Sequence, residues 1–123
     1  MLRVAYTIRP NVLETGKDAM ESLQFRFQHG KRLLLHSAQC VGVVSSGNLE
    51  ILIEPFHLNG DCEISISTAA RGFAPIWEAV MHDFHARWNL RDTRIAINDM
   101  GATPAVVSLR LDQAVESMLQ AAP

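Results

Sequence analysis

The chain has 123 residues, of which 48% are hydrophobic and 20% charged, and its formal net charge is −2 at pH 7. This composition is typical of one globular domain, and it excludes a disordered chain and a strongly basic nucleic-acid-binding surface. No apolar run approaches the ~20 residues that span a bilayer, and Arg3 and Arg9 interrupt the N-terminus too early for a signal peptide. We therefore expect a single domain in the cytoplasm.

The two cysteines, Cys40 and Cys62, are expected to be reduced and structural. Both lie in apolar or alternating stretches, and the other features of a secreted protein stabilised by disulfides are missing. The sequence contains no Cys-x-x-Cys pair that would indicate a redox motif or a zinc site.

The chain is expected to divide at Met20. Residues 1–19 contain a short strand-like run at residues 3–8, followed by Pro10 and a polar stretch. Regular alternation of apolar residues begins only after Met20, and the codon for Met20 could itself be a translation start. We therefore expect residues 1–19 to be a loosely packed extension, and residues 20–123 to form the main domain.

The first half of the main domain reads mostly as strands. Residues 33–44 are apolar and predict one kinked strand or two short ones, which a turn at residues 45–48 follows. Residues 49–54 alternate and predict a half-buried strand that Pro55 ends. An Asn-Gly turn at residues 59–60 leads to a second alternating strand over residues 63–68.

Helical periodicity appears in the second half. Residues 72–89 predict a helix with one wide apolar stripe, formed by Ile76, Trp77, Val80, Met81, Phe84 and Trp88. A strand over residues 93–99 follows, then a second strand over residues 104–109 and a short helix over residues 111–119. Strands joined by short turns, together with two helices, predict an α+β fold with a mainly antiparallel sheet.

Two histidines are candidate metal ligands. His82 and His85 are three residues apart on the predicted helix, a spacing at which two imidazoles can reach one metal ion. However, the sequence contains neither a His-Glu-x-x-His motif nor a third ligand at a recognisable offset. We therefore expect a solvated or partly buried helix face and no metal site. A metal-dependent enzyme remains an alternative.

The serine turn at residues 45–48 is the other candidate site. Its serines lie between two strands, not at the strand-to-helix elbow of a serine hydrolase, so no catalytic residue is predicted. The segment that follows contains four acidic residues and no Lys or Arg, a composition that suits partners with basic docking surfaces. These residues are Glu50, Glu54, Asp61 and Glu63. Most turns of this kind are only turns.

Two segments resemble the hallmarks of a known family. Residues 44–54, Val-Ser-Ser-Gly-Asn-Leu-Glu-Ile-Leu-Ile-Glu, resemble the serine region of the acyl carrier (δ) subunit of malonate decarboxylase, which usually reads Gly-Ser-Gly-Asp-Leu-Glu before an apolar run. Residues 97–111 resemble its second hallmark, Asp-x-Gly-Ala-Thr-Pro-x-Val-Val. The likeness covers residues 20–119, and the citrate lyase acyl carrier (γ) subunit is more distantly similar. The Asp-Ser-Leu motif of the helical acyl carrier proteins is missing, which argues against their four-helix bundle.

The resemblance implies a carrier protein that is not itself an enzyme. It identifies Ser46 as the residue that holds 2′-(5″-phosphoribosyl)-3′-dephospho-coenzyme A through a phosphodiester, which would make the chain a phosphoprotein. Ser45 is the less favoured choice, since it stands where the family commonly has Gly, and Asn48 stands where the family usually has Asp. The thiol of the prosthetic group would hold acetyl and malonyl groups as thioesters.

The resemblance also implies partners. A prosthetic-group holo-transferase would load the carrier, a malonyl transferase subunit would exchange acetate for malonate, and decarboxylase subunits would release CO2. Neither nucleic acid nor a membrane is expected as a partner. The alternatives are a small non-catalytic binding or assembly domain whose serine is unmodified, and the carrier subunit of a citrate-lyase-like complex.

Overall fold

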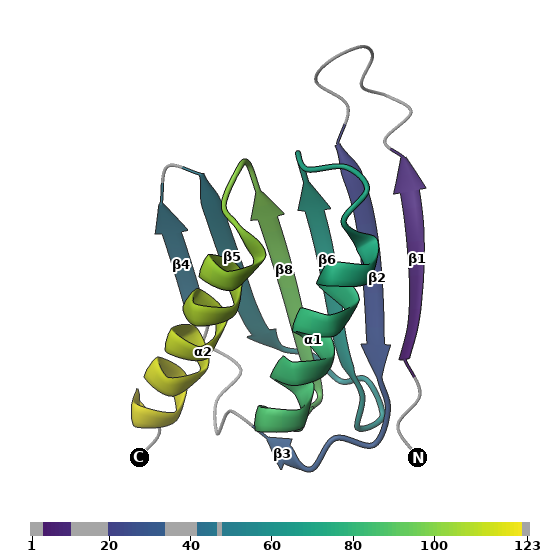
Figure 1. Cartoon of the computed structure of the whole chain (residues 1–123). Coiled ribbons are helices and arrows are strands. Elements are labelled where there is room, and N and C mark those ends of the chain that lie inside the picture. Colours follow the sequence, from purple (N-terminus) through teal and green to yellow (C-terminus); the bar gives the residue numbers. More distant parts are fainter. Residues whose placement is uncertain (1–3, 11–19, 34–41, 47, 122–123) are drawn as a thin grey trace.

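The fold, taken from a computed structural model, is a six-stranded sheet with two helices on one face (Figure 1). The structure describes residues 4–10, 20–33, 42–46 and 48–121, with the backbone alone for residues 4–10, 42–46 and 120–121. From one edge to the other, the strands are β1 (Val4–Pro10), β2 (Glu21–Phe27), β6 (Cys62–Thr68), β8 (Thr93–Asp99), β5 (Leu49–Pro55) and β4 (Gly42–Ser46). The helices are α1 (Ala74–Trp88) and α2 (Pro104–Ala121). Two short strands, β3 (Arg32–Leu33) and β7 (Leu90–Arg91), form a separate parallel pair.

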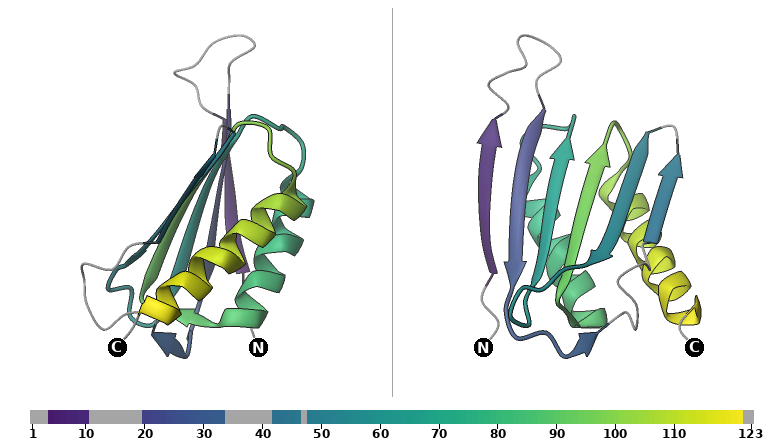
Figure 2. Two further views of the ribbon diagram at one scale, coloured as in Figure 1. Left: turned by 90° about the vertical axis from the view of Figure 1, so that its left-hand side faces the viewer. Right: turned by 180° about the vertical axis from the view of Figure 1, so that it is seen from behind.

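The expected fold class is confirmed. All neighbouring strands of the large sheet are antiparallel except β6 and β8, which are parallel because α1 connects them as a crossover. Both helices pack on the same side of the sheet, and no described element covers the other side (Figure 2). The chain therefore forms two layers.

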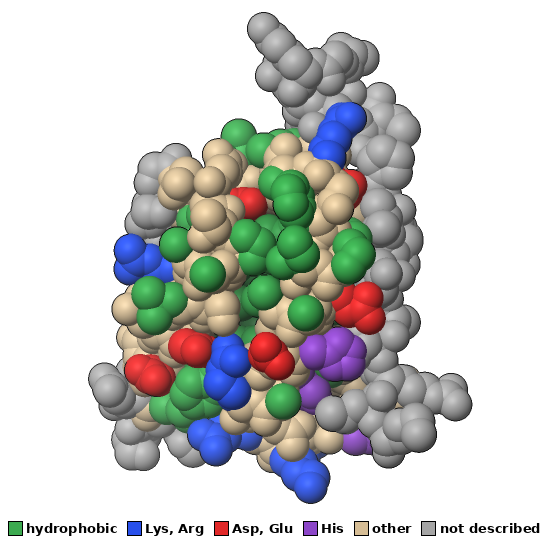
Figure 3. All heavy atoms as spheres, in the orientation of Figure 1, with side chains coloured by type: hydrophobic (Ala, Val, Ile, Leu, Met, Phe, Trp, Pro, Cys, Tyr) green, Lys and Arg blue, Asp and Glu red, His purple; other side chains and the backbone are tan. Residues whose placement is uncertain are grey.

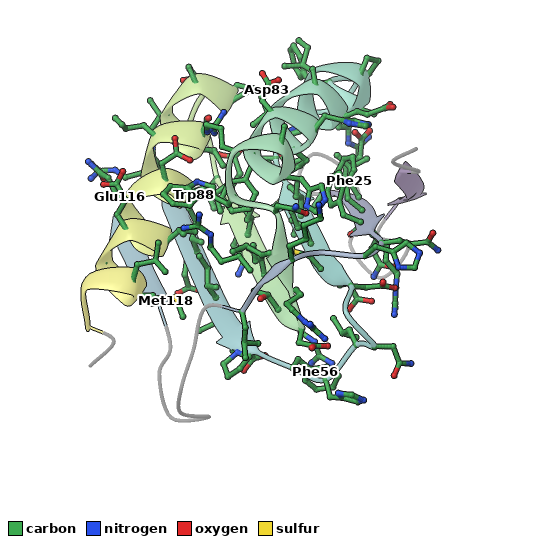
Figure 4. All side chains as sticks on the ribbon, turned by 90° about the horizontal axis from the view of Figure 1, so that it is seen from below. Phe25, Phe56, Asp83, Trp88, Glu116 and Met118 are labelled. Carbon is green, nitrogen blue, oxygen red and sulfur yellow. The ribbon has the colours of Figure 1, made fainter. Side chains whose placement is uncertain are left out.

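The core fills the space between the sheet and the helices. Because successive strand residues point to opposite faces, alternate residues of the four central strands are buried. The largest fully buried side chains include Phe25, Phe27, Ile51, Ile64, Ile95, Trp77 and Phe84. Figure 4 shows Phe25 between the sheet and α1, whereas Asp83 and Glu116 point outward from the helices. The alternation read from the sequence thus identified the buried face of β5, β6 and β8.

Helix α1 matches its predicted range closely, but its buried stripe is narrower than predicted. Pro75 lies in the first turn, and Asn89 ends the helix in the left-handed conformation with φ of 49°. Trp77, Met81 and Phe84 are buried as expected. Ile76, in contrast, is 46% exposed, so its assignment to the core was wrong.

The strand predicted over residues 104–109 was also wrong, because α2 begins at Pro104 and runs to Ala121. The Thr103 hydroxyl accepts a hydrogen bond from the Val106 N–H (3.3 Å) and caps the helix, and proline suits the first turn. Val107 and Leu111 are spaced one helical turn apart and are both fully buried. Packing against the sheet therefore outweighs the strand preference of the two valines. Neither helix is long and apolar enough to cross a membrane.

Strand β1 forms the outer edge of the sheet beside β2. Its backbone pairs with β2 along its whole length, from Val4 opposite Phe27 to Pro10 opposite Glu21. The side chains of this strand and the whole of residues 11–19 lie outside the described residues. The loose packing predicted for residues 1–19 therefore stays a prediction. Of the strand or strands predicted over residues 33–44, residues 34–41 also lie outside the described residues.

Cys62 is a free, buried thiol, as predicted. Burial, with smaller contributions from Glu63 and Asp61, raises its pKa to about 12. The thiolate that reacts with disulfides and metals is therefore strongly disfavoured. Cys40 lies outside the described residues.

Candidate functional site

The candidate site lies where several strands of the sheet begin or end and their connections meet (upper part of Figure 1). Strands β4, β6 and β8 end here, β5 begins here, and both helices start from the connections that follow β6 and β8. We call this end of the strands the hairpin edge, because it contains the turn between β4 and β5. Register places Ser46 opposite Leu49, Leu49 opposite Asp99, and Asp99 opposite Thr68.

Ser46 is the last residue of β4, directly before the turn. Leu49, opposite it, is only 2% exposed, so the start of β5 is anchored in the core. Ser45 lies opposite Glu50, whose side chain is exposed. The side chains of the two serines, and Gly47, lie outside the described residues.

The two hallmark segments, far apart in sequence, meet at the hairpin edge. The N–H of Met100 donates a hydrogen bond to the carbonyl oxygen of Asn48 in the turn (2.9 Å). Asp99, the residue before Met100, pairs with Leu49, the residue after Asn48. The connection between β8 and α2 therefore holds the turn that follows Ser46.

Asp99 organises this connection. It is fully buried, and its Oδ1 accepts hydrogen bonds from the N–H groups of Gly101 (3.2 Å) and Ala102 (2.7 Å). Its Oδ2 accepts one from the Thr68 hydroxyl at the end of β6 (2.9 Å). A carboxylate with three donors is the arrangement that makes a buried charge tolerable. Asp99 therefore supports the connection between β8 and α2.

Thr68 is the residue of this network that the sequence analysis missed. It occupies an inward position of β6, in series with Ile64 and Ile66, and it is fully buried. A hydroxyl in an otherwise apolar series is a signal that a hydrogen-bond partner lies close by. Only the position of β8 beside β6 shows that the partner is Asp99.

Gly101 adopts φ of 131°, a conformation that other residues resist, and a Cβ built there meets no atom within 4 Å. Gly101→Ala should therefore lose about 1–3 kcal/mol of unfolding free energy through backbone strain alone. Urea denaturation measures this loss. Gly60→Ala, also with positive φ and open space but at the opposite edge, is the matched control and should lose a similar amount. Unchanged stability with blocked loading would instead assign Gly101 to partner docking.

The acidic segment does not form a single patch beside the serine turn. Glu50 lies at the hairpin edge, where it accepts a hydrogen bond from the Asn98 amide (3.3 Å). The other three acidic residues lie toward the opposite edge and are in ion pairs with arginines. These pairs are Arg26–Asp61 (2.8 Å), Arg26–Glu63 (3.3 Å), Arg94–Glu54 (3.9 Å) and Arg94–Glu63 (3.9 Å). The predicted acidic docking surface was therefore wrong, because the sheet pairs these charges across strands.

The two candidate histidines pack on one phenylalanine. His85 is 2% exposed and stacks on Phe27 with ring centroids 4.3 Å apart, and His82 meets the edge of the same ring at 5.7 Å. This confirms the predicted partly buried helix face. Within the part of the chain that the structure describes, no group of three or more potential ligands could hold a metal ion.

His85 should make the fold sensitive to acid. Its ring nitrogens have no hydrogen-bond partner among the described residues. Burial, and to a smaller extent His82, lowers its pKa below the usual value of about 6.5. The unfolded chain then takes up a proton that the folded chain does not. This contribution to stability is therefore present above about pH 6.5 and is lost as the pH falls toward the folded-state pKa.

The urea concentration at the midpoint of unfolding, measured at about pH 7.5 and about pH 5.5, tests this expectation. His85→Phe should remove part of the decrease at the lower pH, whereas His57→Phe, at a side chain that is 85% exposed, should retain it. An identical pH dependence in wild type and His85→Phe would contradict the assignment. Asp92 affects stability in a separate, lower pH range, because hydrogen bonds from the N–H groups of Gly60 and Leu58 lower the pKa of its carboxyl.

Comparisons with known proteins agree on one family. The family model described as malonate decarboxylase delta subunit matches residues 36–118. A malonate decarboxylase acyl carrier protein of Xanthomonas euvesicatoria pv. vesicatoria is 63% identical over 99 residues, which are 79% of this chain and 93% of the relative. One from Stenotrophomonas maltophilia K279a is 56% identical over 105 residues, 85% of this chain and 99% of the relative. A chain of a Pseudomonas malonate decarboxylase hetero-tetramer, crystallised with malonate, superposes with a TM-score of 0.66 at 33% identity, over 80% of this chain and 99% of that one.

Proposed function

The chain belongs to the family of malonate decarboxylase delta subunits, the acyl carrier subunits of that enzyme, and on this premise we propose that Ser46 is the residue that bears the acyl-carrying group. The observation that carries the proposal is the position of Ser46 at the end of β4, before a turn that Met100 holds by a 2.9 Å hydrogen bond. A carrier needs its attachment point at an accessible place on a rigid element. The motif Ser-Gly-x-Leu-Glu supports Ser46 over Ser45.

The proposed group is 2′-(5″-phosphoribosyl)-3′-dephospho-coenzyme A, attached by a phosphodiester. The surroundings fit an anionic linkage, because neither helix that starts at this edge has an acidic residue in its first turn. Asn48, exposed in the turn, adds no charge next to Ser46. When bound, the group supplies a thiol whose thioester holds the acyl group and accepts the negative charge that loss of CO2 leaves on the neighbouring carbon.

The chain itself contributes position rather than chemistry to the reaction. We propose that a transferase subunit exchanges the carried acetyl group for malonate, and that decarboxylase subunits then release CO2 with uptake of a proton. One malonate enters, one acetate and one CO2 leave, and the carrier returns to its acetylated form. Tethering at Ser46 raises the effective concentration of the acyl group at each partner without tight binding.

Intact mass of the protein coexpressed with its holo-transferase tests the attachment. The expected result is one adduct of the mass of the arm, which peptide mapping places on Ser46. An unmodified protein that still binds its partners would favour the assembly-domain alternative. Exchange of the carried acetyl group with citrate instead of malonate would favour a citrate-lyase-like complex.

We also propose that residues 20–123 are sufficient for this function. The match to the Xanthomonas relative spans 99 residues, fewer than the full chain has. A variant without residues 1–19 should therefore accept the adduct like the full chain, although it lacks the outer strand β1. If the shortened chain does not fold, residues 1–19 are an integral part of the domain.

A further inference from the structure

Hydrogen bonds of one buried threonine join two of the connections at the hairpin edge. Thr68, the last residue of β6, donates its hydroxyl to Oδ2 of Asp99 (2.9 Å) and accepts a hydrogen bond from the N–H of Ala70 (3.0 Å). The carbonyl oxygen of Asp99 also accepts a hydrogen bond from the N–H of Ala69 (2.9 Å). The connection from β6 to α1 is therefore fastened to the connection from β8 to α2.

Among the described residues, hydrogen bonds alone stabilise the carboxylate of Asp99, since none of their ion pairs includes it. Figure 3 shows the charged side chains of the helix-covered face mostly over its lower part, away from the hairpin edge. The donors to this carboxylate are the N–H groups of Gly101 and Ala102 and the hydroxyl of Thr68. Loss of the hydroxyl would leave a buried carboxylate oxygen without a donor, which is unfavourable.

Met100 connects this arrangement to the serine turn. It lies between Asp99 and Gly101, so the hydrogen bonds that fold the chain back over the Asp99 carboxylate also fix the direction of the Met100 N–H. That N–H donates to the carbonyl oxygen of Asn48 (2.9 Å), two residues after Ser46. If the carboxylate rotates or draws in water, the Met100 N–H shifts and the turn loses this support.

The position of the serine matters most while the arm is being attached. In the proposed attachment, Oγ of Ser46 bonds to a phosphorus of a polyphosphate ester of the arm, and the bond from that phosphorus to the outer phosphates breaks. The outer phosphates leave as an inorganic anion, and the hydroxyl proton passes to a base of the holo-transferase. Such a displacement requires the attacking and leaving oxygens to lie roughly in line. Later steps take place at the thiol, at the far end of the arm.

We propose that Thr68 is a positioning residue for the attachment of the arm to Ser46. Its hydroxyl keeps the Asp99 carboxylate in place, and the Met100 N–H then holds the serine turn at one position for the holo-transferase. This role rests on the function proposed for Ser46. Loss of the hydroxyl should slow attachment, and it should not slow the reactions of a carrier that already bears the arm.

The test compares Thr68→Val with the matched control Thr93→Val. Valine has nearly the shape of threonine but lacks the hydroxyl. Thr93 is also buried, at the opposite end of β8 from Asp99, and its hydroxyl donates to the carbonyl oxygen of Arg91 (2.8 Å). The control therefore loses a buried hydrogen bond far from the serine turn. Thr68→Ser retains the hydroxyl and should behave like wild type.

Two quantities are measured on carrier without the arm. With a purified holo-transferase and a saturating concentration of the polyphosphate ester, Thr68→Val should lower kcat for attachment about tenfold and leave the KM for the carrier within about twofold, because docking is retained but the serine is misplaced. Amide hydrogen exchange, followed by nuclear magnetic resonance, should be about tenfold faster at Met100 in this variant. Thr93→Val should change neither quantity by more than about twofold.

Several results would overturn this role. Equal slowing in Thr68→Val and Thr93→Val would indicate a general loss of stability, and unchanged exchange at Met100 would show that the hydroxyl does not support the turn. Slower acyl transfer by loaded Thr68→Val would show a defect that is not confined to attachment. Should Thr68→Val fail to fold, Thr68→Ala and Thr93→Ala provide the same comparison.

Failure of the function proposed for Ser46 gives a different result. A wild-type carrier that accepts no arm, as measured by intact mass, would refute that function and the role of Thr68 with it. A wild-type carrier that accepts the arm, together with unchanged attachment in Thr68→Val, would refute the role of Thr68 alone.

Discussion

Replacing Ser46 with alanine should leave the fold intact and abolish both covalent attachment and malonate decarboxylation by the assembled complex. Without Oγ there is no atom to form the phosphodiester, and no neighbouring position substitutes for it in the motif. Stability should change by less than about 0.5 kcal/mol, since a hydroxyl beside a turn contributes little. The backbone pairing of Ser46 with Leu49 does not depend on the side chain. Intact mass, urea denaturation and CO2 release measure the three quantities.

Ser45→Ala is the matched control, one residue earlier in the same strand. It should retain the adduct and the activity, because the family pattern places glycine directly after the carrier serine. Gly47 follows Ser46 and not Ser45. An adduct mapped to Ser45, or a loaded and active Ser46→Ala protein, would refute the assignment.

Trp77→Ala should lower the free energy of unfolding by about 3–5 kcal/mol, the largest stability effect expected in this chain. Trp77 is 1% exposed and is the largest of the fully buried side chains, between α1 and the sheet. Its removal loses apolar burial and leaves a cavity that the surrounding strands cannot fill. Urea denaturation followed by far-ultraviolet circular dichroism measures the loss without relying on tryptophan fluorescence.

The neighbouring Ile76→Ala is the control, because Ile76 is on the same helical turn but 46% exposed. Its stability should change by no more than about 0.5 kcal/mol. Comparable losses in the two variants would mean that the two residues are equally buried and that α1 is rotated relative to the structure.

Local patterns determined the elements that a single stretch of sequence can specify. Alternation in residues 49–54, 63–68 and 93–99 gave strands with the observed inward faces, because side chains alternate along any strand. Helical spacing gave α1. For the start of α2, the two adjacent valines wrongly predicted a strand. Strand preference is a local property, whereas the burial of Val107 depends on the rest of the fold. The serine motif likewise identified the candidate attachment site without any structure.

Strand order could be decided only by the tertiary structure. Asn59 and Gly60 have the positive φ that their turn signal predicts, with values of 54° and 92°. Even so, β5 and β6 are not neighbours, because β8 lies between them. The carboxylate of Asp92, just before β8, accepts hydrogen bonds from the N–H groups of Leu58 and Gly60 (both 2.9 Å) and holds the connection. No residue within the turn carries information about that distant partner.

For the candidate site, too, some features could be predicted from the sequence and others only from the structure. The sequence by itself determined the family, the candidate serine and the presence of two hallmark segments. The structure alone showed that these segments meet, through Met100 and Asn48, that Thr68 and Asp99 support the connection, and that three of the four acidic residues are paired with arginines away from the serine turn. Periodicity reports the face of each element, because it arises from the local backbone. Contacts between elements depend on the strand order, and that is set by the packing of the whole core.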